Sequence, residues 1–166
     1  MAIAELVSVE QYLHTDFEPD AEFVEGRIVE RPMPNWEHSR VQIYLANALF
    51  GMERVAGFFA VTEQRIRTRP DRFRVPDLCV VTERPIWRSI VTTPPHLCVE
   101  ILSPENRMPD ILEKVREYLA FGVEWVWVID PDTCSGQIHT ATGVSSVQNR
   151  IFATDRLEID LANVPF

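Results

Sequence analysis

The stretch from Leu97 to Asp130, LCVEILSPENRMPDILEKVREYLAFGVEWVWVID, decides the fold. It opens with a short apolar run that reaches Leu102 and closes with a second run, from Glu124, that is rich in Trp and Val. Between the two runs, apolar residues recur at helical spacing up to Gly122, where we expect the helix to end. Two strands joined by a helix in this order favour a parallel strand pair with the helix packed across it.

Two charged residues interrupt the apolar pattern of this unit. Glu100 lies in the middle of the first strand, and Lys114 lies on the apolar stripe of the helix, about 60° from Ile111 at roughly 100° per residue. Both side chains therefore lean toward the sheet, whereas Glu113 is expected to face solvent. A charge directed at a sheet is costly unless it is paired or used in chemistry. A buried salt bridge and a functional site are both open readings at this stage.

The rest of the chain is predicted to add two helices and several antiparallel strands. A capping box at Ser8 opens a short helix that ends near His14, and Asn35 caps a longer helix from Trp36 to about Met52. Strand and hairpin patterns cover residues 21–31, with a turn at Glu25-Gly26, and residues 58–69, 73–82, 137–142, 144–148 and 157–161.

The composition indicates one globular domain that spans residues 1–166. Hydrophobic residues make up 46% of the chain, yet no apolar run approaches the length of a membrane span, and the N-terminal segment lacks the basic residues of a signal peptide. We therefore expect a cytoplasmic protein without a membrane partner. The cysteines form no CxxC pair, so a zinc site from Cys79, His96 and Cys98 is a minor alternative.

The charge of the chain bears on nucleic-acid binding. A net charge of −9 argues against tight, sequence-independent binding, which depends on neutralising phosphates. It leaves room for a locally basic cleft, and Arg65, Arg67 and Arg69 alternate along a predicted strand so that they share one face. These arginines either pair with the many acids of the chain or form a rim that contacts phosphates.

Two further residues stand out for their positions. Asp77 enters a buried apolar strand directly after Pro76, where a polar residue is unexpected. His38 lies near the middle of the apolar face of the second helix. It is either a core histidine bonded to a backbone carbonyl or a histidine directed into a neighbouring site.

Asp77, Glu100 and Lys114 together form a set with recognisable chemistry. Two carboxylates on adjacent strands can bind one Mg²⁺ or Mn²⁺, and the carbonyl of Ile101 is a candidate further ligand. Such an ion lowers the pKa of a bound water and polarises a phosphoryl oxygen. A lysine within reach can orient that water or stabilise the charge that develops in the transition state.

These motifs resemble the Uma-two family of restriction-endonuclease-like proteins over the range from Ser8 to Phe166. The matching residues are Pro76-Asp77, Val99 to Pro104, Lys114 with Tyr118, Gly122 to Pro131, the Glu25-Gly26 turn and His38. The resemblance implies membership of the PD-(D/E)xK nuclease superfamily and an α/β (α+β) fold. It further implies a mixed central sheet flanked by helices, with hairpins in the N- and C-terminal parts.

The resemblance also implies roles for particular residues. It assigns Asp77 and Glu100 as metal ligands, with His38 and Glu25 in supporting positions. The lysine that the superfamily places two residues after the glutamate is Leu102 here. Many members of the family take this lysine from the following helix, and Lys114 fits that position.

Our first hypothesis is a divalent-metal-dependent endonuclease that hydrolyses phosphodiester bonds of DNA, with RNA a less favoured substrate. The second is a non-catalytic member of the same fold that binds nucleic acid or another protein. A serine hydrolase built on Ser103 and His38 is disfavoured, because no GxSxG motif surrounds the serine. The oligomeric state stays open, with a homodimer as one option.

Overall fold

The computed structural model describes residues 6–18, 20–84 and 90–166. The expectation for the N-terminal segment lies partly outside these ranges. Within them, no helix combines the length and the apolarity needed to cross a bilayer.

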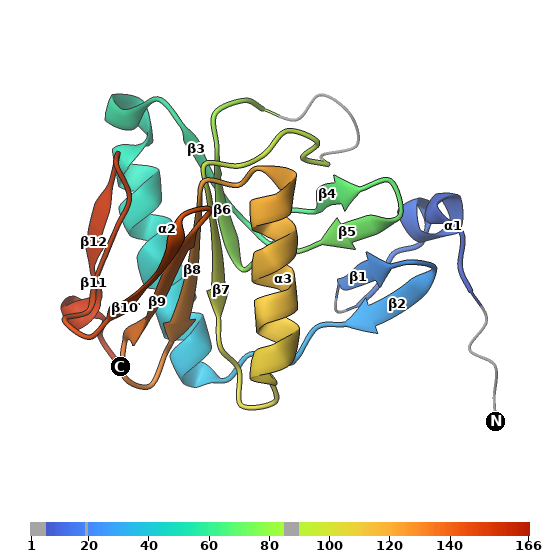
Figure 1. Ribbon diagram of the computed structural model, residues 1–166. Coiled ribbons are helices and arrows are strands. Elements are labelled where there is room, and N and C mark those ends of the chain that lie inside the picture. Colours follow the sequence, from blue (N-terminus) through green and yellow to red (C-terminus); the bar gives the residue numbers. More distant parts are fainter. Residues whose placement is uncertain (1–5, 19, 85–89) are drawn as a thin grey trace.

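A six-stranded mixed sheet with the order β10-β9-β8-β7-β6-β3 forms the centre of the fold (Figure 1). Its strands are β3 (Phe59–Thr62), β6 (Leu78–Val81), β7 (Leu97–Ile101), β8 (Trp125–Asp130), β9 (Ser135–Thr140) and β10 (Gly143–Val147). β7 and β8 are parallel, and α3 (Met108–Phe121) connects them, as predicted from the 97–130 stretch. The other neighbouring strands of this sheet are antiparallel.

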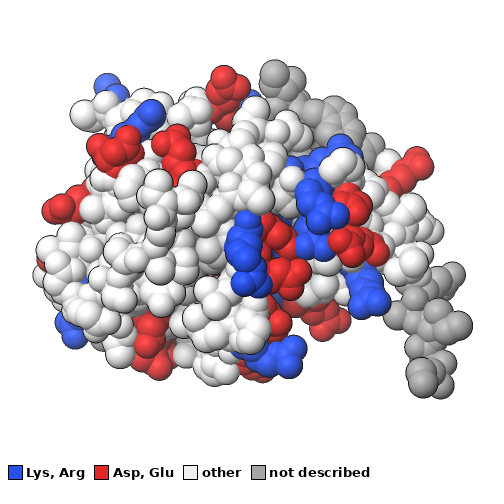
Figure 2. All heavy atoms as spheres, viewed as in Figure 1, with Lys and Arg blue, Asp and Glu red and all other residues white. Residues whose placement is uncertain are grey.

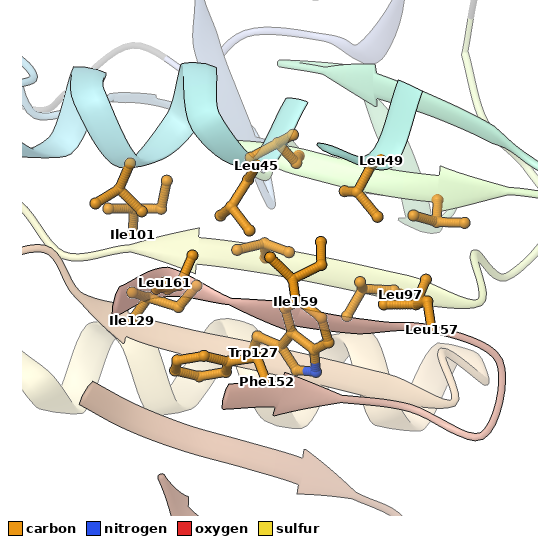
Figure 3. Packing of buried hydrophobic residues seen from close by; sticks show 14 of the residues in the cluster. Leu45, Leu49, Leu97, Ile101, Trp127, Ile129, Phe152, Leu157, Ile159 and Leu161 are labelled. Carbon is orange, nitrogen blue, oxygen red and sulfur yellow. The ribbon is translucent and has the colours of Figure 1, made fainter. Parts of the chain in front are cut away.

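Two helices cover opposite faces of this sheet. α2 (Trp36–Ala56) begins at Asn35 as predicted and runs about one turn longer than expected. Its Leu45 and Leu49 pack on one face together with Trp127, and this core is closed by Phe152 of the C-terminal strands (Figure 3). Those strands, β11 (Ile151–Ala153) and β12 (Glu158–Asp160), form a hairpin that precedes the short 3₁₀ helix η1 (Leu161–Asn163). On the other face, Ile111 and Val115 of α3 pack against alternate residues of β7 and β8.

A smaller antiparallel sheet lies beside α3, with the order β2-β1-β5-β4 (Figure 1). Its strands are β1 (Ala21–Val24), β2 (Arg27–Glu30), β4 (Ile66–Arg69) and β5 (Arg72–Arg74), and α1 (Val9–His14) packs against it. The rings of Tyr12, Phe23 and Phe73 pack together there, with centroids 5.1 to 6.1 Å apart. The capping box at Ser8 and the hairpin turn at Glu25-Gly26 form as predicted.

The predicted strand pair 58–69 and 73–82 is wrong in one respect, because each strand is divided between the two sheets. Glu63 adopts a left-handed conformation, with φ of +52°, and it separates β3 from β4. Pro76, which lacks an N–H for the ladder, lies between β5 and β6. The two breaks place Asp77 at the junction of the large and small sheets.

Candidate active site

Three of the residues singled out in the sequence meet at this junction. Asp77 directly precedes β6, and the pairing of Leu78 with Val99 places it beside Glu100 of β7. Lys114 lies on α3 with its Nζ 3.2 Å from Oε2 of Glu100. All three side chains are largely buried. The structure thus brings two carboxylates and one amine together from two adjacent strands and a helix.

Asp77 uses both of its carboxylate oxygens. Its Oδ2 accepts a hydrogen bond from the backbone N–H of Ile101 at 2.7 Å and lies 3.3 Å from Nε2 of His38. Its Oδ1 accepts a hydrogen bond from Nη2 of Arg31 at 2.8 Å. Burial by itself raises the pKa of Asp77, but His38, the N–H of Ile101 and the charge of Arg31 outweigh burial and hold this pKa below its ordinary value. His38, in the first turn of α2, therefore contacts a charged Asp77.

Glu100 is a buried carboxylate whose charge is only partly compensated. Its Oε1 accepts a hydrogen bond of 2.7 Å from the hydroxyl of Tyr118, and its Oε2 lies near Lys114. Burial, followed by the charges of Asp77 and Glu22, raises the pKa of Glu100 above its ordinary value, although Lys114 and Tyr118 favour the charged form. A bound cation would offset this imbalance, and carboxylate oxygens are ligands that Mg²⁺ and Mn²⁺ prefer. The residues present fit a divalent cation.

Glu22 is a site residue that the sequence analysis did not assign. Its carboxylate lies 2.9 Å from Nζ of Lys114 and 2.7 Å from Nη1 of Arg74, and it accepts a hydrogen bond from the backbone N–H of Val75. Burial alone raises the pKa of Glu22, but Lys114 and Arg74 outweigh it and lower the pKa. The available signal was its place in a strand between two apolar residues, and the same signal identified Glu100.

Glu25, expected in a supporting position, lies away from this cluster. It occupies the first position of the β1–β2 turn, with φ of +50°, and its side chain is exposed. Its carboxylate pairs with Arg72 at 2.8 Å and with Arg69 at 3.3 Å. The turn geometry directs Glu25 toward these arginines, so the structure does not join it to Asp77 and Glu100.

The three alternating arginines have local partners. Arg65 pairs with Asp20 at 2.5 Å, and the guanidinium of Arg67 lies over the ring of Phe73 at 5.5 Å. Arg69 pairs with acids of the neighbouring turns, and a shift of the β4–β5 register separates it from Arg67. These contacts match the reading of a paired strand face, and the phosphate-contacting rim stays a prediction.

A cavity of about 310 Å³ opens over the buried cluster. The cluster residues Asp77, Glu100, Lys114 and His38 line it, and Arg31 does so from the segment after β2. The remaining described residues of its lining are Glu18, Asp20, Pro32, Met33, Pro34, Glu63, Ile101, Ser103 and Asn106. A second cavity of about 490 Å³ shares Arg31 and Lys114 and lies between the β1–β2 hairpin and the start of α3. In Figure 2, acidic and basic side chains gather side by side over α3 and the small sheet beside it.

A second group with metal-ligand chemistry lies at the opposite end of β7 and β8. Here Nδ1 of His96 is 3.5 Å from Glu124, and Nε2 is 3.4 Å from Asp155. His96 therefore faces two acids instead of the cysteines. Cys79 and Cys98 are opposite one another in the β6–β7 register and are buried as free thiols. The zinc site considered from Cys79, His96 and Cys98 does not form among these residues.

Comparisons with known proteins agree with the fold and with the motifs. The family model Uma2, described as "Putative restriction endonuclease", matches residues 9–162. A solved structure from Anabaena variabilis ATCC 29413, described as a "putative nuclease", superposes with a TM-score of 0.77 at 23% sequence identity, covering 89% of each chain. At that identity the structural likeness shows the shared fold. No curated protein gives a match. The resemblance found in the sequence and the predicted fold class are confirmed.

Proposed function

This chain belongs to the Uma2 family of restriction-endonuclease-like proteins, and from that premise we propose that it is a divalent-metal-dependent endonuclease that hydrolyses phosphodiester bonds of DNA. The observation that carries the proposal is the convergence of Asp77, Glu100 and Lys114 in one cavity. Two adjacent carboxylates and an amine are the groups that a metal-assisted hydrolysis of phosphodiesters requires.

Asp77 and Glu100 are the proposed ligands of Mg²⁺ or Mn²⁺, and the carbonyl of Ile101 is a proposed third ligand. The adjacency of the two carboxylates and the raised pKa of Glu100 support this assignment. When bound, the ion supplies a Lewis acid for a phosphoryl oxygen and a more acidic water.

Lys114 is the proposed stabiliser of negative charge on the phosphoryl group. It is the only lysine in a chain with fifteen arginines. Burial by itself lowers its pKa, but the carboxylates of Glu100 and Glu22 outweigh burial and raise the pKa above its ordinary value. The amine therefore stays protonated, and a fixed cation in a buried site stabilises developing charge more strongly than one in water.

Two side chains act on the proposed ligands without being ligands themselves. Tyr118 donates a hydrogen bond to Oε1 of Glu100, and His38 contacts Oδ2 of Asp77. Within the described residues, Nδ1 of His38 has no hydrogen-bond partner. We assign both residues a positioning role.

A non-catalytic module of the same fold is the second candidate. It is favoured by the full pairing of Asp77, which already has Arg31, His38 and the N–H of Ile101 as partners. Such pairing is what a purely structural cluster would display.

Calorimetric titration with Mn²⁺ separates the two candidates. We expect wild type to bind the ion and Asp77→Asn to lose this binding, because the variant removes a carboxylate ligand. Asp71→Asn, which changes an exposed acid in the β4–β5 turn, is the matched control and should bind as wild type does. Undiminished Mn²⁺ binding by Asp77→Asn would contradict the metal assignment.

A further inference from the structure

Arg31 is a residue of the cavity that the sequence did not single out. It follows β2 directly, and its side chain is only 14% exposed. Besides the 2.8 Å contact with Asp77, its Nη1 lies 3.7 Å from Oε1 of Glu63. Among the described residues that line the cavity, Arg31 and Lys114 are the two with an Arg or Lys side chain.

The guanidinium of Arg31 occupies a place that a bound cation would need. Oδ2 of Asp77 receives the N–H of Ile101 and faces His38, so Oδ1 is the less engaged oxygen, and Arg31 holds it. A divalent ion at Asp77 would therefore lie next to the positive guanidinium of Arg31, at a buried position where water screens the repulsion poorly. The two cations compete for one carboxylate.

Of the partners of Asp77, Arg31 is the one that can leave. The N–H of Ile101 is held by β7, and His38 is held by the first turn of α2. Arg31, in contrast, begins the segment 31–35, which belongs to no helix or strand. Its second partner, Glu63, is 53% exposed, so that contact contributes little.

We propose that a divalent ion binds to Asp77 by displacing the guanidinium of Arg31, and that the released guanidinium becomes the phosphate contact of the cavity. This inference rests on the proposed metal-dependent function. A guanidinium fork fits a phosphate as well as it fits a carboxylate, so the exchange keeps its hydrogen-bonding chemistry. Lys114 keeps its proposed role at the reacting phosphoryl group, but Glu22 and Glu100 hold its amine on two sides, so it is not free to move to a further phosphate. The exchange also explains how a cavity rimmed by Glu18, Asp20 and Glu63 accepts a polyanion.

Mn²⁺ titration without nucleic acid tests the displacement. Arg31→Gln removes the competing charge, so its dissociation constant for Mn²⁺ should fall by roughly tenfold relative to wild type, which is the effect of an ion-pair coupling of moderate size. Arg27→Gln, on the same hairpin but exposed, is the matched control and should bind Mn²⁺ as wild type does.

The outcomes separate this inference from the proposed function. If Asp77→Asn abolishes Mn²⁺ binding while Arg31→Gln binds no tighter than wild type, the displacement is refuted and the metal site stands. If Asp77→Asn binds Mn²⁺ normally, the proposed function itself fails.

Arg31→Gln leaves a buried carboxylate with one partner fewer and is expected to be less stable without metal. If Arg31→Gln does not fold, Arg31→Lys is the test variant. A lysine lacks the two parallel N–H donors of a guanidinium, so the ion should displace it more easily. Mn²⁺ should then raise the melting temperature of Arg31→Lys more than that of wild type, and an equal rise would overturn the inference.

Binding of a DNA duplex in Ca²⁺ tests the phosphate contact. Arg31→Gln should bind the duplex several-fold more weakly, and the slope of log affinity against log salt should become shallower by about one. Tighter Mn²⁺ binding combined with unchanged DNA affinity would refute the phosphate contact.

Discussion

The two ends of the parallel β7–β8 pair differ in how they hold charge. At the cavity end, Glu100 and Lys114 are buried and each has two charged or hydrogen-bonding partners. At the other end, His96 is buried, but its acidic partners Glu124 and Asp155 are each 56% exposed. Water screens the charges of the exposed acids. It does not reach the buried carboxylates, so charges interact more strongly there. A cation or a lost charge should therefore have a large effect at the cavity end and a small one at the His96 end.

The largest expected effect is that of Lys114→Met. This variant should bind Mn²⁺ and DNA but lose plasmid cleavage by on the order of 100-fold or more, as is typical when an electrostatic stabiliser of a transition state is removed. Cleavage is compared at matched metal and DNA occupancy. Glu113→Gln changes the neighbouring residue, whose side chain is 51% exposed, and should cut nearly as well as wild type. Equal cleavage by wild type and Lys114→Met would remove Lys114 from the chemistry.

His38→Leu should have the next largest effect. The variant loses the contact with Oδ2 of Asp77, so we expect cleavage to fall by about tenfold or more, as for the loss of a positioning contact. Leucine fills a similar volume, but the variant leaves the buried carboxylate of Asp77 with one partner fewer, so the melting temperature should fall and cleavage is compared well below it. Full activity in His38→Leu would show that the histidine only packs.

The pH dependence of stability compares the two ends directly. The pKa of Asp77 in the folded protein lies below its ordinary value. Asp77 therefore stabilises the fold at pH values above the ordinary pKa range of a carboxylate. This contribution is lost as the pH falls through that range, near 4, toward the folded pKa. In urea unfolding without metal, wild type should therefore lose more stability between pH 6 and pH 3 than Asp77→Asn does. Glu124→Gln, at the His96 end, should parallel wild type. Parallel curves for wild type and Asp77→Asn would show that the pairing of Asp77 contributes nothing.

The smallest expected effect concerns the arginines in and directly before β4. Replacing Arg65, Arg67 and Arg69 by serine should weaken DNA binding and flatten its salt dependence if they contact phosphates. Their present partners, which include Asp20 and the ring of Phe73, reduce the expected effect. A salt slope identical to that of wild type would make them a structural, paired surface.

Local pattern was enough to find Glu100 and Lys114. A strand residue surrounded by apolar neighbours and a helix residue on the apolar stripe must both face the sheet. A local pattern also identified Asp77, because an acid between Pro76 and an apolar strand is unexpected whatever the distant contacts are.

Long-range packing decided what the sequence did not reveal. Glu22 reaches Lys114 and Arg31 reaches Asp77 because the small sheet lies beside α3, and no local pattern specifies that arrangement. Charges on a two-stranded hairpin are usually solvated, so its residues gave no local sign of a site, and Glu25 was preferred to Glu22 only through the family resemblance. The division of residues 58–69 at Glu63 depends on a left-handed residue that is neither Gly nor Asn, and its sequence signal is weak.

A crystal structure grown with Mn²⁺, with the ion located by its anomalous scattering, tests the central claim most directly. We predict an anomalous peak at coordination distance from the carboxylates of Asp77 and Glu100, with the guanidinium of Arg31 moved away from Oδ1 of Asp77. A peak at His96, Glu124 and Asp155 instead, or no peak at Asp77 with Arg31 still in place, would contradict the assignment of the metal-dependent site.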